Sequence, residues 1–97
     1  MKEIINQVFA IEQRSKKENV DSFNRNIKRI YHEFETLGFK VINPLGQAYK
    51  NEMTDVEASI VGEITNKMKI IKVLKPIIYK TENEHTILIQ KGIVVVE

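Results

Sequence analysis

Glycine and proline are absent from the first 37 residues of this chain. All six of them come later, at Gly38, Pro44, Gly46, Gly62, Pro76 and Gly92. Because both residue types interrupt helices and mark turns, their distribution predicts a helical first part and a turn-rich second part. We therefore divide the chain into residues 1–37 and residues 38–97.

Within residues 1–37, apolar side chains recur at the spacing of amphipathic helices. Ile4, Val8 and Ile11 mark the first of these helices. A second helix is marked by residues three or four positions apart, at Val20, Phe23, Ile27, Ile30, Phe34 and Leu37. The two patterns are out of phase, which predicts a break and then a second helix with Asp21 or Ser22 as its N-cap.

Residues 38–97 are rich in β-branched side chains, which favour strands. The pair Leu37-Gly38 has the pattern of a helix end with glycine at the C′ position. Further on, the alternation of apolar residues changes phase at Ile70-Ile71, which predicts a bulge or a strand buried on both faces. Five or six short strands are expected, within residues 39–43, 56–63, 68–74, 77–79, 86–90 and 93–96. The expected fold class is α+β, with a helical hairpin followed by a small all-β domain.

The second helix predicts self-association. Its apolar residues exceed what one short neighbouring helix covers, and isolated helices of this length are marginal in water. A second copy of the chain would complete a four-helix bundle. The predicted interface of this homodimer contains Ile5, Val8, Phe23, Ile27, Ile30 and Phe34. The alternative is that the second helix packs on the sheet of its own chain.

The composition offers little material for catalysis. The chain has no cysteine, which excludes thiolate chemistry and cysteine-ligated metals and suits a cytoplasmic location. The two histidines, His32 and His85, lack metal-binding spacing, and there is no glycine-rich phosphate loop. The longest apolar run, Ile93–Val96, is far too short to span a membrane. We therefore expect a protein that is not an enzyme and has no cofactor, metal or membrane segment.

Five lysines from Lys67 to Lys80 stand without an intervening acid. A basic strand of this kind can follow a phosphate backbone. However, no aromatic side chain between Lys67 and Lys75 is available to stack on a base, and simple alternation does not place Lys72 on the face of Lys69. Nucleic-acid binding through Lys67–Lys80 is therefore the alternative function, and a solvated strand face is the favoured interpretation.

After the helix pair, residues 37–42 read Leu-Gly-Phe-Lys-Val-Ile, and a Gly46-x-x-Tyr49 turn and a small predicted sheet follow. These elements and motifs, taken in their order along the chain, resemble the GrpE family of nucleotide exchange factors. The resemblance covers nearly the whole chain. The family's Gly-x-x-Phe-Asp-Pro-x-x-His-Glu-Ala element corresponds to residues 46–56, which keep the aromatic residue but lack the Asp-Pro pair and the histidine. The closing residues 89–96 resemble the family's Leu-Arg-x-Ala-x-Val-x-Val, with Gln90 where a basic residue is usual.

The resemblance implies a function without catalysis. A homodimer would dock on the ATPase domain of a DnaK-type chaperone and hold the nucleotide cleft open, so that ADP leaves. A partner of this kind acts only by binding the open state more tightly than the closed one. By the family's pattern, the contact surface contains Tyr79, the turn at His85, and Val94 and Val96 of the last strand.

Overall fold

In the computed structural model, which describes residues 1–97, the chain is α+β, with two helices and six short strands in two small sheets. Helix α1 spans Lys2–Lys17 and helix α2 spans Asn24–Thr36, so the predicted break between two helices is confirmed. Asn19 ends α1 in a left-handed conformation, with φ of 54°. Its amide donates to the carbonyl of Lys16, and the next amide donates to the carbonyl of Ser15, which together form a Schellman motif.

The sequence predicted the C-terminal end of α2 correctly and its N-terminal end incorrectly. The expected N-cap at Asp21 or Ser22 is wrong, because the N-cap is Phe23, whose side chain makes no cap hydrogen bond. The carbonyl of Asp21 instead accepts a backbone hydrogen bond of 3.2 Å in the preceding turn. At the other end, Gly38 has φ of +91° and donates its amide to the carbonyl of Glu35, as expected of a C′ glycine.

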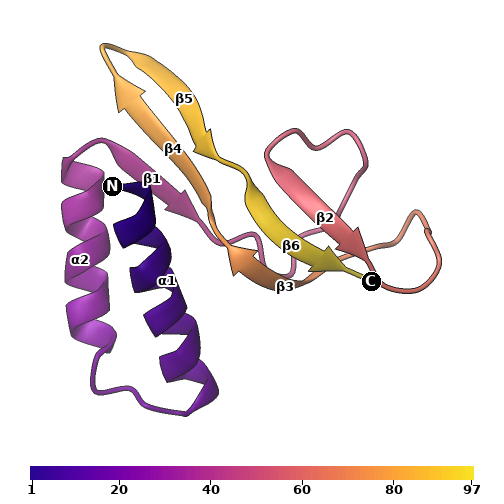
Figure 1. Ribbon diagram of the computed structural model, residues 1–97, viewed down its shortest axis with the longest axis horizontal. Helices are drawn as coiled ribbons and strands as arrows, with labels where there is room; N and C mark the ends of the chain where they lie inside the picture. The colour runs from indigo at the N-terminus through magenta and orange to yellow at the C-terminus, as the bar shows by residue number, and fades with distance from the viewer.

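Six strands follow the helices. Their bounds are β1 Phe39–Ile42, β2 Val56–Ile60, β3 Ile70–Lys75, β4 Ile77–Glu82, β5 His85–Gln90 and β6 Gly92–Val96. Only Pro76 separates β3 from β4, and only Lys91 separates β5 from β6. Since β4 pairs with β5 and β3 pairs with β6, both antiparallel, these four strands form one long hairpin that bends halfway (Figure 1).

The bend allows one hairpin to contribute to two sheets. Strand β1 adds to β4 in antiparallel fashion and completes the sheet β1-β4-β5. Strand β2 adds to β6 in parallel fashion and completes the sheet β2-β6-β3. The pairing of β3 with β6 shifts between Ile70 and Lys72 and again between Val73 and Lys75. Of the two alternatives predicted at Ile70-Ile71, a bulge or a strand buried on both faces, the structure thus shows the bulge.

The helices share a hydrophobic core with the first sheet. Ile5, Val8, Ile27 and Phe34 are buried together with Phe39 of β1 and Ile78 of β4. These four helix residues were predicted to face a second copy of the chain, and this part of the prediction is wrong because they are buried within their own chain. Gly38 leads from α2 directly into β1, and the two elements are in contact. The change at residue 38 is therefore one of secondary structure, and it does not separate two cores.

A second core lies under the sheet β2-β6-β3, where six buried residues meet. They are Val56, Met68, Ile70, Ile77, Val94 and Val96. Only 17 of the 97 residues are buried, and the molecule measures 40 × 39 × 18 Å. Its radius of gyration, 14.5 Å, exceeds the value of about 12.5 Å expected for a compact chain of this length. A flat shape with thin cores leaves apolar side chains on the surface.

No helix of this structure is long and apolar enough to cross a lipid bilayer.

Candidate functional site

The residues that the sequence analysis assigned to a partner do not form one surface. Val94 and Val96 are exposed by only 1% and 0%, because β6 is the central strand of its sheet and turns both side chains into the second core. The expectation that these valines form an exposed docking edge is therefore wrong. Their strand does end the chain, but β2 and β3 cover both of its edges.

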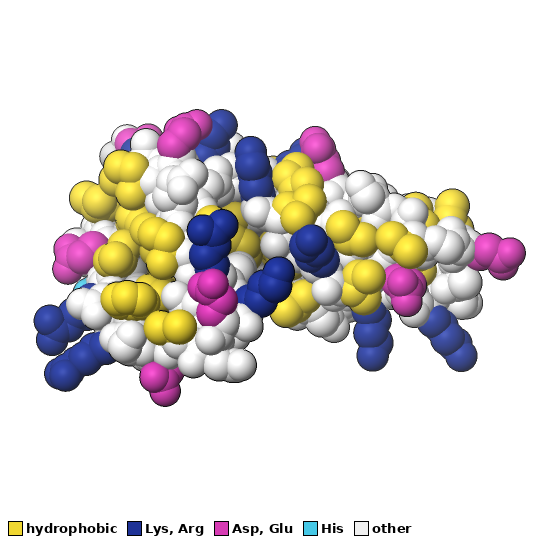
Figure 2. Space-filling model, turned by 60° about the horizontal axis from the view of Figure 1, so that its bottom comes forward, with side chains coloured by type: hydrophobic (Ala, Val, Ile, Leu, Met, Phe, Trp, Pro, Cys, Tyr) yellow, Lys and Arg dark blue, Asp and Glu magenta, His cyan; other side chains and the backbone are white.

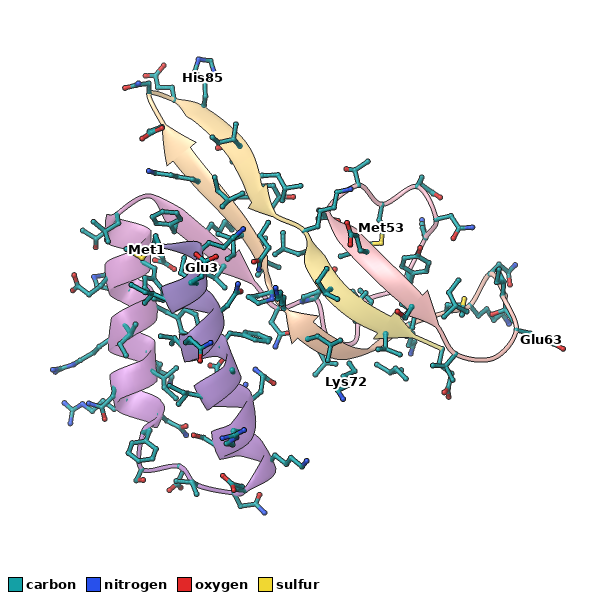
Figure 3. The ribbon with its side chains drawn as sticks, viewed as in Figure 1. Met1, Glu3, Met53, Glu63, Lys72 and His85 are labelled. Carbon is teal, nitrogen blue, oxygen red and sulfur yellow. The ribbon has the colours of Figure 1, made fainter.

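Tyr79 and His85 lie on different parts of the long hairpin. The Tyr79 side chain is half-buried against the second core, and its hydroxyl donates a hydrogen bond of 3.3 Å to Oδ2 of Asp55. Burial and the Asp55 carboxylate both raise the pKa of Tyr79, so its proton stays bound. His85 is exposed beside the turn between β4 and β5, at the far tip of the hairpin from Lys72 (Figure 3). The structure does not bring these two residues together.

The sheet β2-β6-β3 has an apolar surface on the side that faces away from the second core. The sequence did not predict this surface. Val95 pairs with Lys72 and Ile93 pairs with Lys75, so these four side chains share the face that points away from the second core. Ile71 and Leu74 are the extra residues at the two bulges, and they are exposed by 48% and 53%. We call this set, Ile71, Lys72, Leu74, Lys75, Ile93 and Val95, the outer face.

Two bulges in one short strand explain why the outer face is apolar. In a bulge, two successive residues oppose a single residue of the neighbouring strand, so strict alternation is lost. Ile71 joins Lys72 and Leu74 joins Lys75 opposite single β6 residues. Figure 2 shows hydrophobic side chains beside Lys or Arg side chains on the corresponding side of the molecule. The phase change at Ile70-Ile71 was the sequence signal for this face.

The lysines of β3 and β4 divide between two environments. Lys72 and Lys75 share the outer face, although simple alternation predicted otherwise, because one bulge lies between them. Lys80 is separate from this group: its Nζ lies 3.3 Å from Oε1 of Glu82 and 5.1 Å from the ring centroid of Phe39. The five lysines therefore do not form one continuous basic track.

No group of three or more histidine, cysteine, aspartate or glutamate side chains is gathered closely enough to hold a metal ion. No family model, curated protein or solved structure shows significant similarity to this chain. We therefore infer function from the outer face, from the exposed helix residues and from the order of the sequence motifs.

Proposed function

We propose that this chain is a non-catalytic nucleotide exchange factor of the type that the GrpE family represents. In this proposal a homodimer docks on the ATPase domain of a DnaK-type chaperone in the cytoplasm and promotes release of ADP. The exchange factor needs no reacting group, since it acts by preferring the open nucleotide cleft. The resemblance in motif order along the chain supports this proposal.

The observation that carries the proposal is the uncovered outer face of β3 and β6. Four apolar side chains, Ile71, Leu74, Ile93 and Val95, are half-buried or exposed there. Apolar centres with a charged rim are typical of protein-binding surfaces, and here Lys72 and Lys75 supply the rim. We assign the docking contact to this outer face, in place of the buried Val94 and Val96.

The homodimer belongs to the same proposal. Its interface keeps Phe23 and Ile30 of the residues first predicted, which are exposed, and replaces the four buried ones. Ile4 and Ile11 on α1 lie seven residues apart, as do Phe23, Ile30 and Leu37 along α2 and its flanks, and all five are exposed. Heptad spacing places each set on one stripe of its helix. Figure 2 shows hydrophobic side chains gathered over the helix pair at the left of the view. We propose that these stripes form the interface with the second copy of the chain.

The decisive experiment measures release of a fluorescent ADP analogue from a DnaK-type chaperone, with a full-length family member as positive control. The unmodified chain should accelerate release, and the double variant Ile71→Asp, Leu74→Asp should bind the ATPase domain at least about tenfold more weakly. Both side chains are already exposed, so the variant should keep its fold. Ile64→Asp is the matched control, because Ile64 is exposed in the loop between β2 and β3 and lies outside the outer face.

Unchanged ADP release at saturating chain would reject the exchange function. Binding of the ATPase domain without release would show that docking exists and the opening step does not.

Nucleic-acid binding remains the second candidate, because Lys72 and Lys75 share one face. Binding to phosphates weakens steeply with added salt, whereas apolar docking does not. Lys72→Glu, Lys75→Glu should therefore have a small effect on chaperone binding, and it should abolish binding of a single-stranded oligonucleotide if the second candidate is correct.

A further inference from the structure

A cavity of about 210 Å³ opens where the two helices meet β1, and no residue of the outer face or of the exposed helix stripes lines it. Its walls are contributed by Phe9 and Glu12 of α1 and by Tyr31 and Glu35 of α2. Strand β1 adds Phe39 and Val41, and Asn43 follows it. The three aromatic rings and the two carboxylates come from three different elements, so no single sequence motif encodes this site.

The charge of the cavity is unbalanced. Glu12 and Glu35 line it, and no lysine, arginine or histidine does. The one ion pair of the structure joins Lys80 to Glu82, so neither cavity glutamate has a cationic partner in its own chain. The Glu12 carboxylate is held in place, because its Oε1 accepts hydrogen bonds from the Tyr31 hydroxyl at 3.2 Å and from Nε2 of Gln13 at 3.4 Å. Its second oxygen, Oε2, makes no hydrogen bond within the chain.

Aromatic rings and carboxylates in one cavity favour a cation. The face of an aromatic ring attracts ammonium and guanidinium groups, and carboxylates accept hydrogen bonds from the same groups. The ring of Phe39 already shows this attraction, since Nζ of Lys80 lies 5.1 Å from its centroid. The volume of about 210 Å³ leaves room for a guanidinium with its adjoining methylenes.

We propose that this cavity, which we call the anionic aromatic pocket, receives the side chain of an arginine presented by a partner polypeptide. A guanidinium is planar and can lie against aromatic rings while its several donors reach Glu12 and Glu35 from opposite helices. A lysine ammonium is a compact, strongly hydrated charge and uses flat aromatic walls less well. This inference does not depend on the exchange function or on the outer face.

The test is a titration of the complete chain followed by two-dimensional NMR, with four probes. These probes are arginine capped at both ends, capped citrulline, capped lysine and free L-arginine. Citrulline matches arginine in shape and lacks its charge. Capped arginine should shift the signals of Phe9, Tyr31 and Phe39 in a saturable manner, more strongly than capped lysine, and capped citrulline should leave them unchanged. Free arginine should bind no better than capped arginine, because the pocket holds only the side chain and the opposite charges of the free α-ammonium and α-carboxylate groups offset each other.

Three variants locate the site. Glu12→Gln and Glu35→Gln should each weaken capped-arginine binding about tenfold, because each removes one charge-assisted hydrogen bond. Glutamine at position 12 still accepts the Tyr31 hydrogen bond, so this variant should keep its fold. Glu33→Gln on the same helix as Glu35 does not line the cavity and should bind as the unmodified chain does.

Several outcomes would overturn the proposal. Equal shifts with capped citrulline would remove the electrostatic argument, and equal binding of capped lysine would remove the preference for a guanidinium. Tighter binding of free arginine than of capped arginine would indicate a small-molecule site in place of a polypeptide partner. The pocket would be shown to take no cation if capped arginine shifted none of the three aromatic residues. The same conclusion would follow if Glu12→Gln and Glu35→Gln bound capped arginine as well as the unmodified chain does.

Discussion

The side-chain amide of Gln90 joins three segments that are far apart in the sequence. Its Oε1 accepts a hydrogen bond from Nδ2 of Asn6, and its Nε2 donates to Oδ1 of Asn6 and to the carbonyl of Pro76, all at 2.8 Å. The paired amides fix α1 on the first sheet, and the third bond holds the hairpin at its bend. A basic residue, which the resemblance led us to expect here, could donate to these groups but could not accept from Asn6.

Replacing Gln90 by alanine should therefore destabilise the chain. Loss of this side chain leaves the Asn6 amide and the Pro76 carbonyl without partners in a half-buried setting, a cost of about 1–3 kcal/mol. Urea denaturation measures this change, and the double variant Asn6→Ala, Gln90→Ala measures the coupling between the two amides. If the two single variants added without coupling, the amide pair would contribute nothing specific to the docking of α1.

Tyr31 makes the stability of the fold sensitive to alkaline pH. Burial raises the pKa of Tyr31 well above its ordinary value of 10.0, and the charge of Glu12 and the hydrogen bond to it act in the same direction. The folded chain thus holds this proton more tightly than the unfolded chain. The stability gained is fully present below pH 10.0 and is lost as the pH rises further, where the unfolded tyrosine ionises first.

We predict that the free energy of unfolding falls progressively as the pH rises above about 10, the ordinary pKa of tyrosine. Tyr31→Phe should reduce this slope without abolishing it, since the pKa of Tyr79 is also raised. Denaturation curves at several pH values test this, and an identical slope in the variant would show that Tyr31 does not carry the effect.

At the scale of secondary-structure elements, the junction between α2 and β1 depends on Gly38. Its φ of +91° is rarely adopted by other residues, and a Cβ at this position would lie 2.8 Å from the carbonyl oxygen of Thr81. Gly38 and Thr81 also begin the pairing of β1 with β4, because the Thr81 amide donates a hydrogen bond of 2.8 Å to the Gly38 carbonyl. The turn and the start of the first sheet are thus built at one residue.

Gly38→Ala should cost stability for two reasons, backbone strain and the clash with Thr81. Gly46 provides a matched control, since its φ is +84° and a Cβ added there would have no atom within 4 Å. Gly46→Ala should cost about 1–2 kcal/mol from the left-handed backbone alone. Gly38→Ala should cost more than this, as measured by thermal or urea denaturation. Equal losses in the two variants would mean that the turn relaxes and the clash has no effect.

At the scale of the whole molecule, a flat shape with two thin cores leaves two apolar surfaces uncovered. One is the outer face of the second sheet, and the other consists of the exposed stripes on the helices. On α2 a buried stripe and an exposed stripe are adjacent: Ile27 is exposed by 4%, whereas Ile30 is exposed by 38%. A substitution at the buried Ile27 should therefore affect folding, whereas a substitution at the exposed Ile30 should affect only association.

The dimer proposal predicts opposite behaviour for these two isoleucines. Ile30→Asp should convert the dimer to a monomer and keep the fold, because the new carboxylate can reach water in the separated chains. Ile27→Asp should unfold the chain, because it buries an unpaired charge in the first core at a cost of several kcal/mol. Sedimentation at tens of micromolar, together with circular dichroism, distinguishes the two. A monomeric unmodified chain at that concentration would contradict the dimer.

The helices, most of the strands and their boundaries follow from local patterns in the sequence. The distribution of glycine and proline located the boundary at residue 38, the helical periodicity located two helices with a break between them, and the phase change at Ile70-Ile71 located a bulge. These features depend on interactions between near neighbours in the chain, such as the positive φ of Gly38. The α+β class followed from them, and the structure confirms it.

Packing between distant segments determines which apolar face of an element is covered and which element covers it. Periodicity shows that a helix has an apolar side, but Ile27 and Ile30 fit the same pattern, and only Ile27 belongs to the core that the helices share with the first sheet. Val94 faces the core and Val95 faces outward because two other strands flank β6 and fix its orientation. The anionic aromatic pocket likewise combines residues from α1, α2 and β1, whose proximity arises from packing between distant segments and leaves no spacing in the sequence.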